Sequence, residues 1–155
     1  MDLRRFRAIT ISTFFYVGFL PFIPGTFGSL AGLLLYYLVK SNGLLYLLAA
    51  SVVIVLGFLF SSEAEKALGK KDARPIVIDE VSGMLIALMF LPFDYRLVII
   101  GFFLFRLLDT VKPFPASRIE KAQGSLGIMG DDIIAGVYTN IILQLVLRLA
   151  SFKTS

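Results

Sequence analysis

Five carboxylates stand where uncharged, apolar stretches of this 155-residue chain begin or end. Asp79-Glu80 precede one such stretch, Asp131-Asp132 precede another, and Asp109 lies near the end of a third. Helix capping explains Asp79 or Asp131 alone, because a helix N-terminus favours negative charge. It does not explain two adjacent acidic pairs, or Asp109 at a C-terminal helix end, where the dipole is unfavourable. A bound divalent cation explains all five.

The composition narrows both the metal and the chemistry. The chain has no cysteine and no histidine, which excludes thiolate and histidine nucleophiles and nearly all ordinary zinc sites. Carboxylate oxygens without nitrogen or sulfur ligands favour Mg²⁺ or Mn²⁺. More carboxylates are present than one Mg²⁺ needs, so a second metal ion and a separate general base are both open. The residues predicted to bind Mg²⁺ or to act in catalysis are Asp79, Glu80, Asp109, Asp131 and Asp132.

Two cations flank Asp109 at spacings that suit a phosphate site. Arg106 and Lys112 lie three residues before and after Asp109, so all three would share nearly one face if the helix continued past Pro113. We predict that both cations bind a phosphate dianion, since arginine grips two oxygens and lysine supplies a point charge. An Arg106–Asp109 salt bridge, or a Lys112 that reaches the membrane interface, is the structural alternative and is compatible with that role.

Two segments rich in small residues precede expected helices. In the first, residues 24–29, we predict that Gly25, Thr26 and Ser29 bind phosphate, because free N–H groups and the positive dipole end meet at a helix start. A Pro-Gly turn with ordinary Ser or Thr capping is the alternative. In the second, residues 124–130, the glycines predict a loop that folds over the site and delivers Asp131 and Asp132. A flexible turn is the alternative there.

Apolar helices must position these residues. Hydrophobic residues make up 57% of the chain, and residues 8–39, 41–62, 81–93 and 133–147 carry no charge. Because crossing a bilayer takes ~20 residues, this pattern indicates a membrane protein. We expect helices at about 26–39, 44–60, 79–91, 96–110 and 131–149, a surface loop or helix end at 63–74, and a polar loop up to residue 130. The expected architecture is all-α: one domain, residues 1–155, formed by a compact integral membrane bundle of about four to five apolar helices.

Basic residues predict the orientation of this bundle. They form three clusters, at residues 4–7, 66–74 and 112–121, and cytoplasmic loops are enriched in Lys and Arg. Placing all three clusters inside puts the turns at 40–43 and 92–95 outside. It leaves residues 8–20 as an N-terminal interfacial or re-entrant segment. The carboxylates and the residue 24–29 segment then share the cytoplasmic side.

With those residues assembled, the chain resembles the phosphatidylglycerophosphatase A family. The matching motifs occur in the family's order: Ile23-Pro24-Gly25-Thr26-Phe27-Gly28-Ser29, Ile78-Asp79-Glu80-Val81-Ser82-Gly83-Met84, residues 105–115 (FRLLDTVKPFP) and residues 127–136 (GIMGDDIIAG). The resemblance implies Mg²⁺-dependent hydrolysis of phosphatidylglycerophosphate to phosphatidylglycerol and phosphate, in phospholipid biosynthesis at the cytoplasmic face of the bacterial cytoplasmic membrane. It also implies that the acidic residues of these motifs are metal ligands or catalysts and that Arg106 and Lys112 hold the phosphate. Ser125 departs from the family, which often has glycine there.

Other designs fit the residues less well. The signature of membrane CDP-alcohol phosphotransferases is absent, as is the spacing of two aspartates that the haloacid dehalogenase design requires. A small membrane cation carrier or channel could use acidic residues as an ion path, but it predicts carboxylates spread through the membrane depth. A metal-activated water is the most economical nucleophile, and a carboxylate nucleophile stays open.

Overall fold

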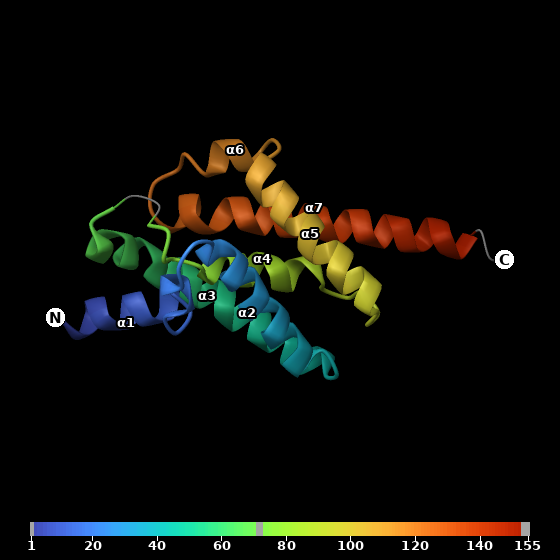
Figure 1. Cartoon of the computed structure of the whole chain (residues 1–155), viewed down its shortest axis with the longest axis horizontal. Helices are drawn as coiled ribbons and strands as arrows, with labels where there is room; N and C mark the ends of the chain where they lie inside the picture. Colours follow the sequence, from blue (N-terminus) through green and yellow to red (C-terminus); the bar gives the residue numbers. More distant parts are fainter. Residues whose placement is uncertain (1, 71–72, 153–155) are drawn as a thin grey trace.

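The computed structural model describes residues 2–70 and 73–152, and every regular element in this part of the chain is helical. The all-α prediction is therefore confirmed. The described residues form seven α-helices, which Figure 1 labels, and one short 3-10 helix. In chain order they are α1 (Leu3–Ser12), η1 (Val17–Phe19), α2 (Pro24–Val39), α3 (Gly43–Leu68), α4 (Ile78–Ala87), α5 (Tyr95–Val111), α6 (Ala116–Ile119) and α7 (Ser125–Phe152).

Local sequence signals set several of these boundaries. Pro24 occupies the first turn of α2, where a missing N–H costs nothing. The Asn42 side chain accepts a hydrogen bond from the Leu45 N–H and caps α3, and Asp94 caps α5 in the same way through the Arg96 N–H. Gly69 ends α3 in the left-handed conformation, with φ of 68°.

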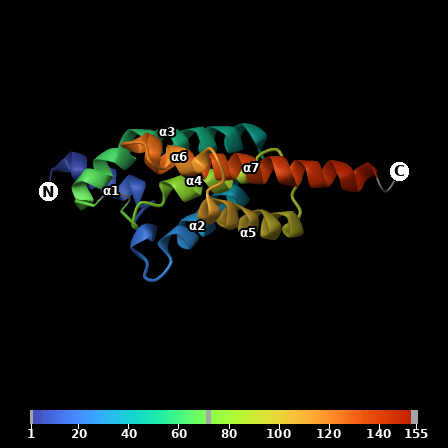
Figure 2. The same cartoon turned by 90° about the horizontal axis from the view of Figure 1, so that it is seen from above.

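The short helix α4 lies in the middle of the molecule. Figure 2 shows α2 and α5 on one side of it and α3 and α7 on the other. Most of its side chains are buried, and two glycines permit its close contact with α7: a Cβ at Gly136 would lie only 2.4 Å from the Gly83 carbonyl oxygen. Where α4 ends, Asn140 of α7 donates hydrogen bonds to the carbonyl oxygens of Ala87 and Met89. Backbone groups that a longer helix would pair internally are satisfied in this way.

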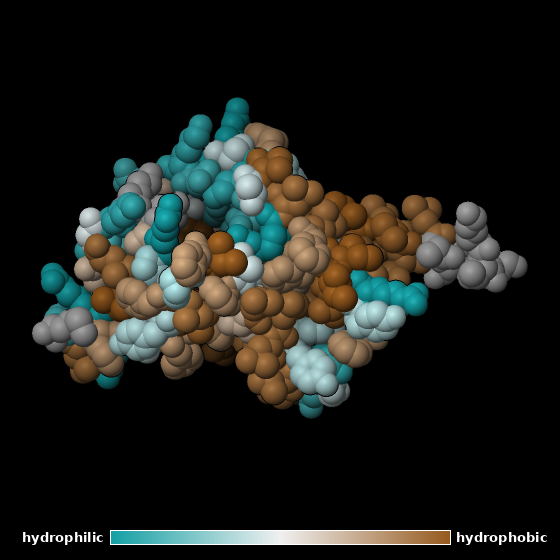
Figure 3. All heavy atoms as spheres, in the orientation of Figure 1, coloured by the Kyte–Doolittle hydropathy of each residue, from teal (hydrophilic) through white to brown (hydrophobic). Residues whose placement is uncertain are grey.

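The outer surface is strongly apolar. Large exposed hydrophobic side chains cover the outward faces of α2, α3, α5 and α7, among them Leu34, Leu59, Phe103 and Leu145. Figure 3 shows hydrophobic residues over the centre and right of one face and hydrophilic residues gathered at its upper left. In the described residues, α3 and α7 are long and apolar enough to cross a membrane. The expected membrane bundle of about four to five apolar helices is not confirmed, because α2, α4 and α5 have only 16, 10 and 17 residues.

Several helix boundaries differ from the predicted ones. Helix α3 continues to Leu68 through the segment predicted as a loop or helix end, and α4 stops at Ala87 rather than residue 91. Helix α7 begins at Ser125, so Gly127 and Gly130 are helical and the predicted loop up to residue 130 was wrong. The physical reason is close packing: a Cβ at Gly127 would lie 2.2 Å from the Ala122 carbonyl oxygen, and one at Gly130 would lie 2.3 Å from the Ile119 side chain.

The N-terminal segment at residues 8–20 is partly helical. Helix α1 contacts α3 and ends at Ser12, where a turn leads into η1. The side chains of Ala8, Ser12 and Thr13 are fully buried. One side of this segment is therefore fixed to the bundle, and its position relative to a bilayer stays a prediction.

Candidate active site

A cavity of about 700 Å³ opens where the N-terminal ends of α2, α4 and α7 meet the C-terminal end of α5. The antiparallel course of the helices places these four ends together. Nine of the ten residues predicted as site residues line the cavity: Gly25, Thr26, Asp79, Glu80, Arg106, Asp109, Lys112, Asp131 and Asp132. The structure thus assembles motifs from distant parts of the chain, while the role of each residue stays a prediction.

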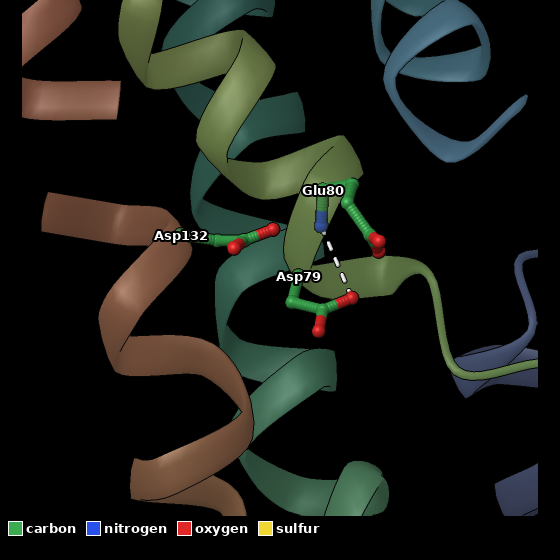
Figure 4. A group of neighbouring side chains, drawn as sticks. All are labelled: Asp79, Glu80 and Asp132. Atoms are coloured by element: carbon green, nitrogen blue, oxygen red, sulfur yellow. Dashed lines mark hydrogen bonds between the residues drawn. The ribbon is translucent and has the colours of Figure 1, made fainter. Parts of the chain in front are cut away.

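The carboxylates form two groups that share Asp132. One group is Asp79, Glu80 and Asp132, and the other is Asp109, Asp131 and Asp132. Within each group, one carboxylate oxygen of every residue lies within 4.8 Å of the others. Figure 4 shows Asp79 and Glu80 at the start of α4, with Asp132 approaching from α7. A Glu80 N–H donates to Asp79 Oδ1 at 3.1 Å, which fixes the Asp79 side chain in the first turn of α4.

Three carboxylate oxygens of this site are buried and have no hydrogen-bond partner among the described residues. They are Glu80 Oε2, Asp131 Oδ1 and Asp132 Oδ2. The Asp131 and Asp132 residues are only 5% and 3% exposed, so water reaches them poorly. A buried unpaired carboxylate oxygen is costly, and clustered carboxylates also repel one another. The oxygens available, and their spacing, fit a hard divalent cation such as Mg²⁺ or Mn²⁺.

Both predicted phosphate cations are paired with site carboxylates. Arg106 Nη1 donates to Asp109 Oδ2 at 2.7 Å along one face of α5. Lys112 Nζ donates to Glu120 Oε1 at 3.0 Å and also to Asp131 Oδ2. Burial lowers the pKa of the Lys112 ammonium, but these two hydrogen bonds raise it more, so its pKa lies above the ordinary value. Lys112 is therefore a permanent cation that joins α5 to α6 and α7.

Lys112 does not share one helical face with Arg106 and Asp109. Helix α5 ends at Val111, and Lys112 adopts the left-handed conformation with φ of 48°. Pro113 follows and cannot continue the helix. The condition for a shared face, a helix that continues past Pro113, is therefore not met. Lys112 still lines the cavity because the turn directs it toward Asp131.

The start of α2 approaches the carboxylates because residue 25 is a glycine. A Cβ there would lie 2.4 Å from Glu80 Oε1 and 3.2 Å from Arg106 Nη2. Thr26 lines the cavity beside it. Ser29 does not: it is fully buried and its hydroxyl donates to the Gly25 carbonyl oxygen at 3.0 Å. One further turn of helix carries Ser29 away from the opening, and the hydroxyl is used inside α2.

Some cavity residues were missed by the sequence reasoning. They are Phe22, Glu65, Arg74, Glu120 and Lys121, among others. Arg74 and Lys121 were recognised only as members of basic clusters, and no salt bridge or side-chain hydrogen bond occupies either cation in the described part of the chain. Helix α6, which carries no apolar periodicity in its 4 residues, gave no signal that Glu120 would face Lys112.

Comparison with known proteins gives a consistent family. A model of the family described as phosphatidylglycerophosphatase A matches residues 10–147. A phosphatidylglycerophosphatase A of Escherichia coli is 40% identical over 83% of this chain and 77% of its own, and that of Haemophilus influenzae is 34% identical over 77% and 76%. A protein of Bacteroides thetaiotaomicron named putative phosphatidylinositol-3-phosphatase is 37% identical over 89% of this chain and 92% of its own. No solved structure matches.

These matches include all residues that line the cavity, and the matched family and relatives are phosphatases. They therefore favour a phosphatase over the alternative of a cation carrier or channel. In the described residues the acidic side chains also concentrate at one end of the helices instead of following a path through them. The chain belongs to the phosphatidylglycerophosphatase A family and is a lipid phosphatase.

Proposed function

We propose that this enzyme hydrolyses the phosphate monoester of phosphatidylglycerophosphate, with Mg²⁺ held by carboxylates of α4, α5 and α7, at the cytoplasmic face of the membrane. The observation that carries the proposal is the set of buried, unpaired carboxylate oxygens beside cations in one cavity. The names of the Escherichia coli and Haemophilus influenzae relatives support this lipid as the substrate. The products are phosphatidylglycerol and inorganic phosphate.

The metal would be held by the residues that share close oxygens. Asp79, Glu80 and Asp132 offer one set of ligands, and Asp109 and Asp131 offer a second set with Asp132. When bound there, Mg²⁺ supplies charge that stabilises the phosphoryl oxygens in the transition state and lowers the pKa of a bound water. The unpaired oxygens Glu80 Oε2 and Asp132 Oδ2 are the natural donors, since cation binding would remove the cost of leaving them unpaired.

The remaining groups would position the substrate and move the proton. Arg106 and Lys112 keep free N–H donors after pairing with carboxylates, and these donors can hold oxygens of the phosphate. Water attacks the phosphorus, the bond from phosphorus to the glycerol oxygen breaks, and that oxygen leaves. A carboxylate of the cluster would take one proton from the attacking water, and that proton would then be delivered to the leaving glycerol oxygen to give the alcohol.

The placement at the membrane rests on surface chemistry. Exposed apolar side chains cover α3 and α7, which have the length and composition of spanning helices. The cavity lies at the ends of helices whose adjoining segments carry the basic residues of α1, of residues 66–74 and of α6. Cytoplasmic loops favour Lys and Arg, so this pattern supports a cavity that faces the cytoplasm.

The experiment is phosphate release by the detergent-purified protein from phosphatidylglycerophosphate, with Mg²⁺ present and with EDTA in excess. We expect release that stops with EDTA and returns when Mg²⁺ is restored. Because the Bacteroides relative carries a different substrate name, phosphatidylinositol 3-phosphate is the comparison lipid. No release from phosphatidylglycerophosphate by folded protein, or release that EDTA leaves intact, would contradict the proposal.

Variants separate the metal site from general damage. Asp132→Asn removes the carboxylate that both groups share, and it should abolish phosphate release and weaken the binding of Mn²⁺ measured by calorimetry on the purified protein. Asp94→Asn is the matched control, because Asp94 is exposed, caps α5 far from the cavity, and asparagine is an equally good cap. Normal Mn²⁺ binding by Asp132→Asn would remove the metal assignment even if activity is lost.

A further inference from the structure

An exposed aromatic loop lies beside the cavity. Residues 14–23, here called the aromatic loop, connect α1 to α2 and carry no charged residue. Phe22 is 94% exposed and Phe15 is 73% exposed, and Phe19, Leu20 and Ile23 are also exposed. Several large apolar side chains in one short segment facing outward are expensive in water. Something apolar is therefore expected to cover this loop.

Specific contacts hold the backbone of the aromatic loop in one conformation. Phe14, Phe15, Tyr16 and Phe22 all adopt positive φ, which side chains other than glycine rarely do. Three contacts hold this backbone. The Val77 N–H donates to the Ser12 carbonyl oxygen at 2.9 Å, the Tyr16 N–H donates to Thr13 Oγ1 at 3.1 Å, and Gly18 lies against the Pro75 carbonyl. Phe14 packs against the core, and the structure holds the rings of Phe15 and Phe22 outward.

The loop forms part of the cavity wall. Phe22 and Ile23 line the cavity together with Gly25 and Thr26, and Figure 1 shows the loop leading directly into the start of α2. On its other side the exposed apolar face of α2 continues along the bundle through Leu30 and Leu34. The apolar surface therefore runs without a charged residue from the outer face of α2 to the rim of the cavity.

The surroundings favour a lipid surface as the cover. Arg4, Arg5 and Arg7 are exposed on α1, immediately before the loop. Aromatic side chains next to basic ones suit the interface of an anionic bilayer, where rings enter the acyl boundary and cations meet head groups. A segment that packs against another protein copy would not need this band of arginines.

We propose that the aromatic loop inserts into the bilayer interface and forms the side of the cavity from which the lipid substrate enters, with Phe22 contacting the acyl chains. This proposal rests on the proposed function for the identity of the substrate. The phosphate monoester would reach the carboxylates while the acyl chains stay in the membrane along Phe22 and α2. A water-soluble phosphate ester has no acyl chain to contact this wall, so the aromatic loop would not contribute to its binding.

The first test measures depth and needs no turnover. The chain contains no tryptophan, so Phe22→Trp introduces a single tryptophan, whose emission can be excited selectively in the presence of the tyrosines. The protein is placed in nanodiscs of phosphatidylglycerol and phosphatidylcholine, with or without bromine on the acyl chains. We expect blue-shifted emission that brominated lipid quenches and aqueous iodide does not. Emission at the water position with quenching by iodide would overturn the proposal, as would blue-shifted emission that brominated lipid leaves intact, the result expected if a second copy covers the ring.

Two further tryptophan variants calibrate this measurement. Phe103→Trp lies on the exposed apolar face of α5 and should be quenched by brominated lipid, and Gln123→Trp lies on the exposed polar side and should be quenched by iodide. The proposal requires that brominated lipid quench Phe22→Trp as it quenches Phe103→Trp. Because no substrate is present, this result is independent of whether phosphatidylglycerophosphate is hydrolysed.

The second test is kinetic. Phe22→Asn removes the ring, and asparagine tolerates the positive φ of 76° at this position. We expect its KM for phosphatidylglycerophosphate in mixed micelles to rise about tenfold, equivalent to about 1.4 kcal/mol, with a smaller change in kcat, and we expect Phe22→Trp to restore it. Phe90→Asn is the matched control: Phe90 is 76% exposed with φ of 59° and lies outside the cavity lining. Equal KM values for the two asparagine variants would refute the acyl contact.

Discussion

Replacing Gly136 with alanine should separate the two helices that carry four of the five site carboxylates. A Cβ at Gly136 would lie 2.4 Å from the Gly83 carbonyl oxygen, whereas an ordinary contact begins at 3.4 Å. The obstacle is backbone, which cannot rotate away as a side chain would. Helices α4 and α7 must therefore move apart by about 1 Å near this point.

Gly136→Ala should lower both the stability and the activity of the protein. Overpacking of this kind costs about 1–3 kcal/mol of the free energy of unfolding. The site is more sensitive, because its carboxylate oxygens lie within 4.8 Å of one another across α4 and α7. Misplacing catalytic groups by about 1 Å can lower a rate roughly 100-fold. We expect Gly136→Ala to lose far more activity than its stability loss explains.

The assay compares the midpoint of thermal unfolding, followed by circular dichroism in detergent, with phosphate release at a temperature where both proteins are folded. Gly43→Ala is the control, since a Cβ there meets nothing within 4 Å and alanine in the first turn of α3 stabilises the helix by up to ~1 kcal/mol. If Gly136→Ala unfolds and turns over like Gly43→Ala, the close approach of α4 and α7 does not hold the carboxylates in place.

Three further predictions test other parts of the structure. Arg106→Lys should lower kcat/KM roughly 10- to 100-fold, because the planar donor fork is lost at a charged hydrogen bond; wild-type kinetics would make this arginine purely structural. Asn140→Leu leaves two carbonyls at the end of α4 unpaired and should destabilise the protein by about 1–3 kcal/mol in thermal unfolding, more than Gln144→Leu, whose side chain donates only to Asn140. Ser29→Ala should keep phosphate release near the wild-type rate, whereas Thr26→Ala should raise KM. If Ser29→Ala raises KM and Thr26→Ala does not, Ser29 contacts the substrate and Thr26 does not.

The sequence was sufficient to predict where the carboxylates meet. Adjacent acids at the start of apolar segments are expensive in a membrane without partners, so Asp79-Glu80 and Asp131-Asp132 had to lie at helix ends. Short connections between apolar segments make neighbouring helices antiparallel, and the basic clusters then assign one side to all these ends. The cavity that contains the carboxylates at this end of the helices follows from that pattern.

The details that the sequence did not predict depend on contacts between particular pairs of groups. Lys112 leaves the helical face because the chain turns at Pro113 and Asp131 attracts its ammonium, a partner 19 residues away. Ser29 turns inward because its hydroxyl finds the Gly25 carbonyl within its own helix. Gly127 looked like a loop residue, yet its missing side chain serves the contact between α7 and the Ala122 carbonyl. Periodicity and composition carry no information about such pairs.

The charges of the cavity lining predict that the proposed metal binds before the phosphate. Seven acidic and four basic side chains line the cavity, and Arg106 and Lys112 are already paired with carboxylates. With the carboxylates ionised, a phosphate dianion would meet a net negative surface and be repelled. With seven acidic and four basic side chains the lining carries a formal charge of −3, so one divalent cation would lower it to −1 and a second would bring it to +1. Neither cation need displace the existing ion pairs. A guanidinium has five donors and an ammonium three, so Arg106 and Lys112 can stay oriented by Asp109 and Asp131 while other N–H groups face the phosphate. If the proposed metal site is correct, the carboxylates would serve twice, as metal ligands and as the groups that orient the cations, and we expect the lipid phosphate to bind after the metal.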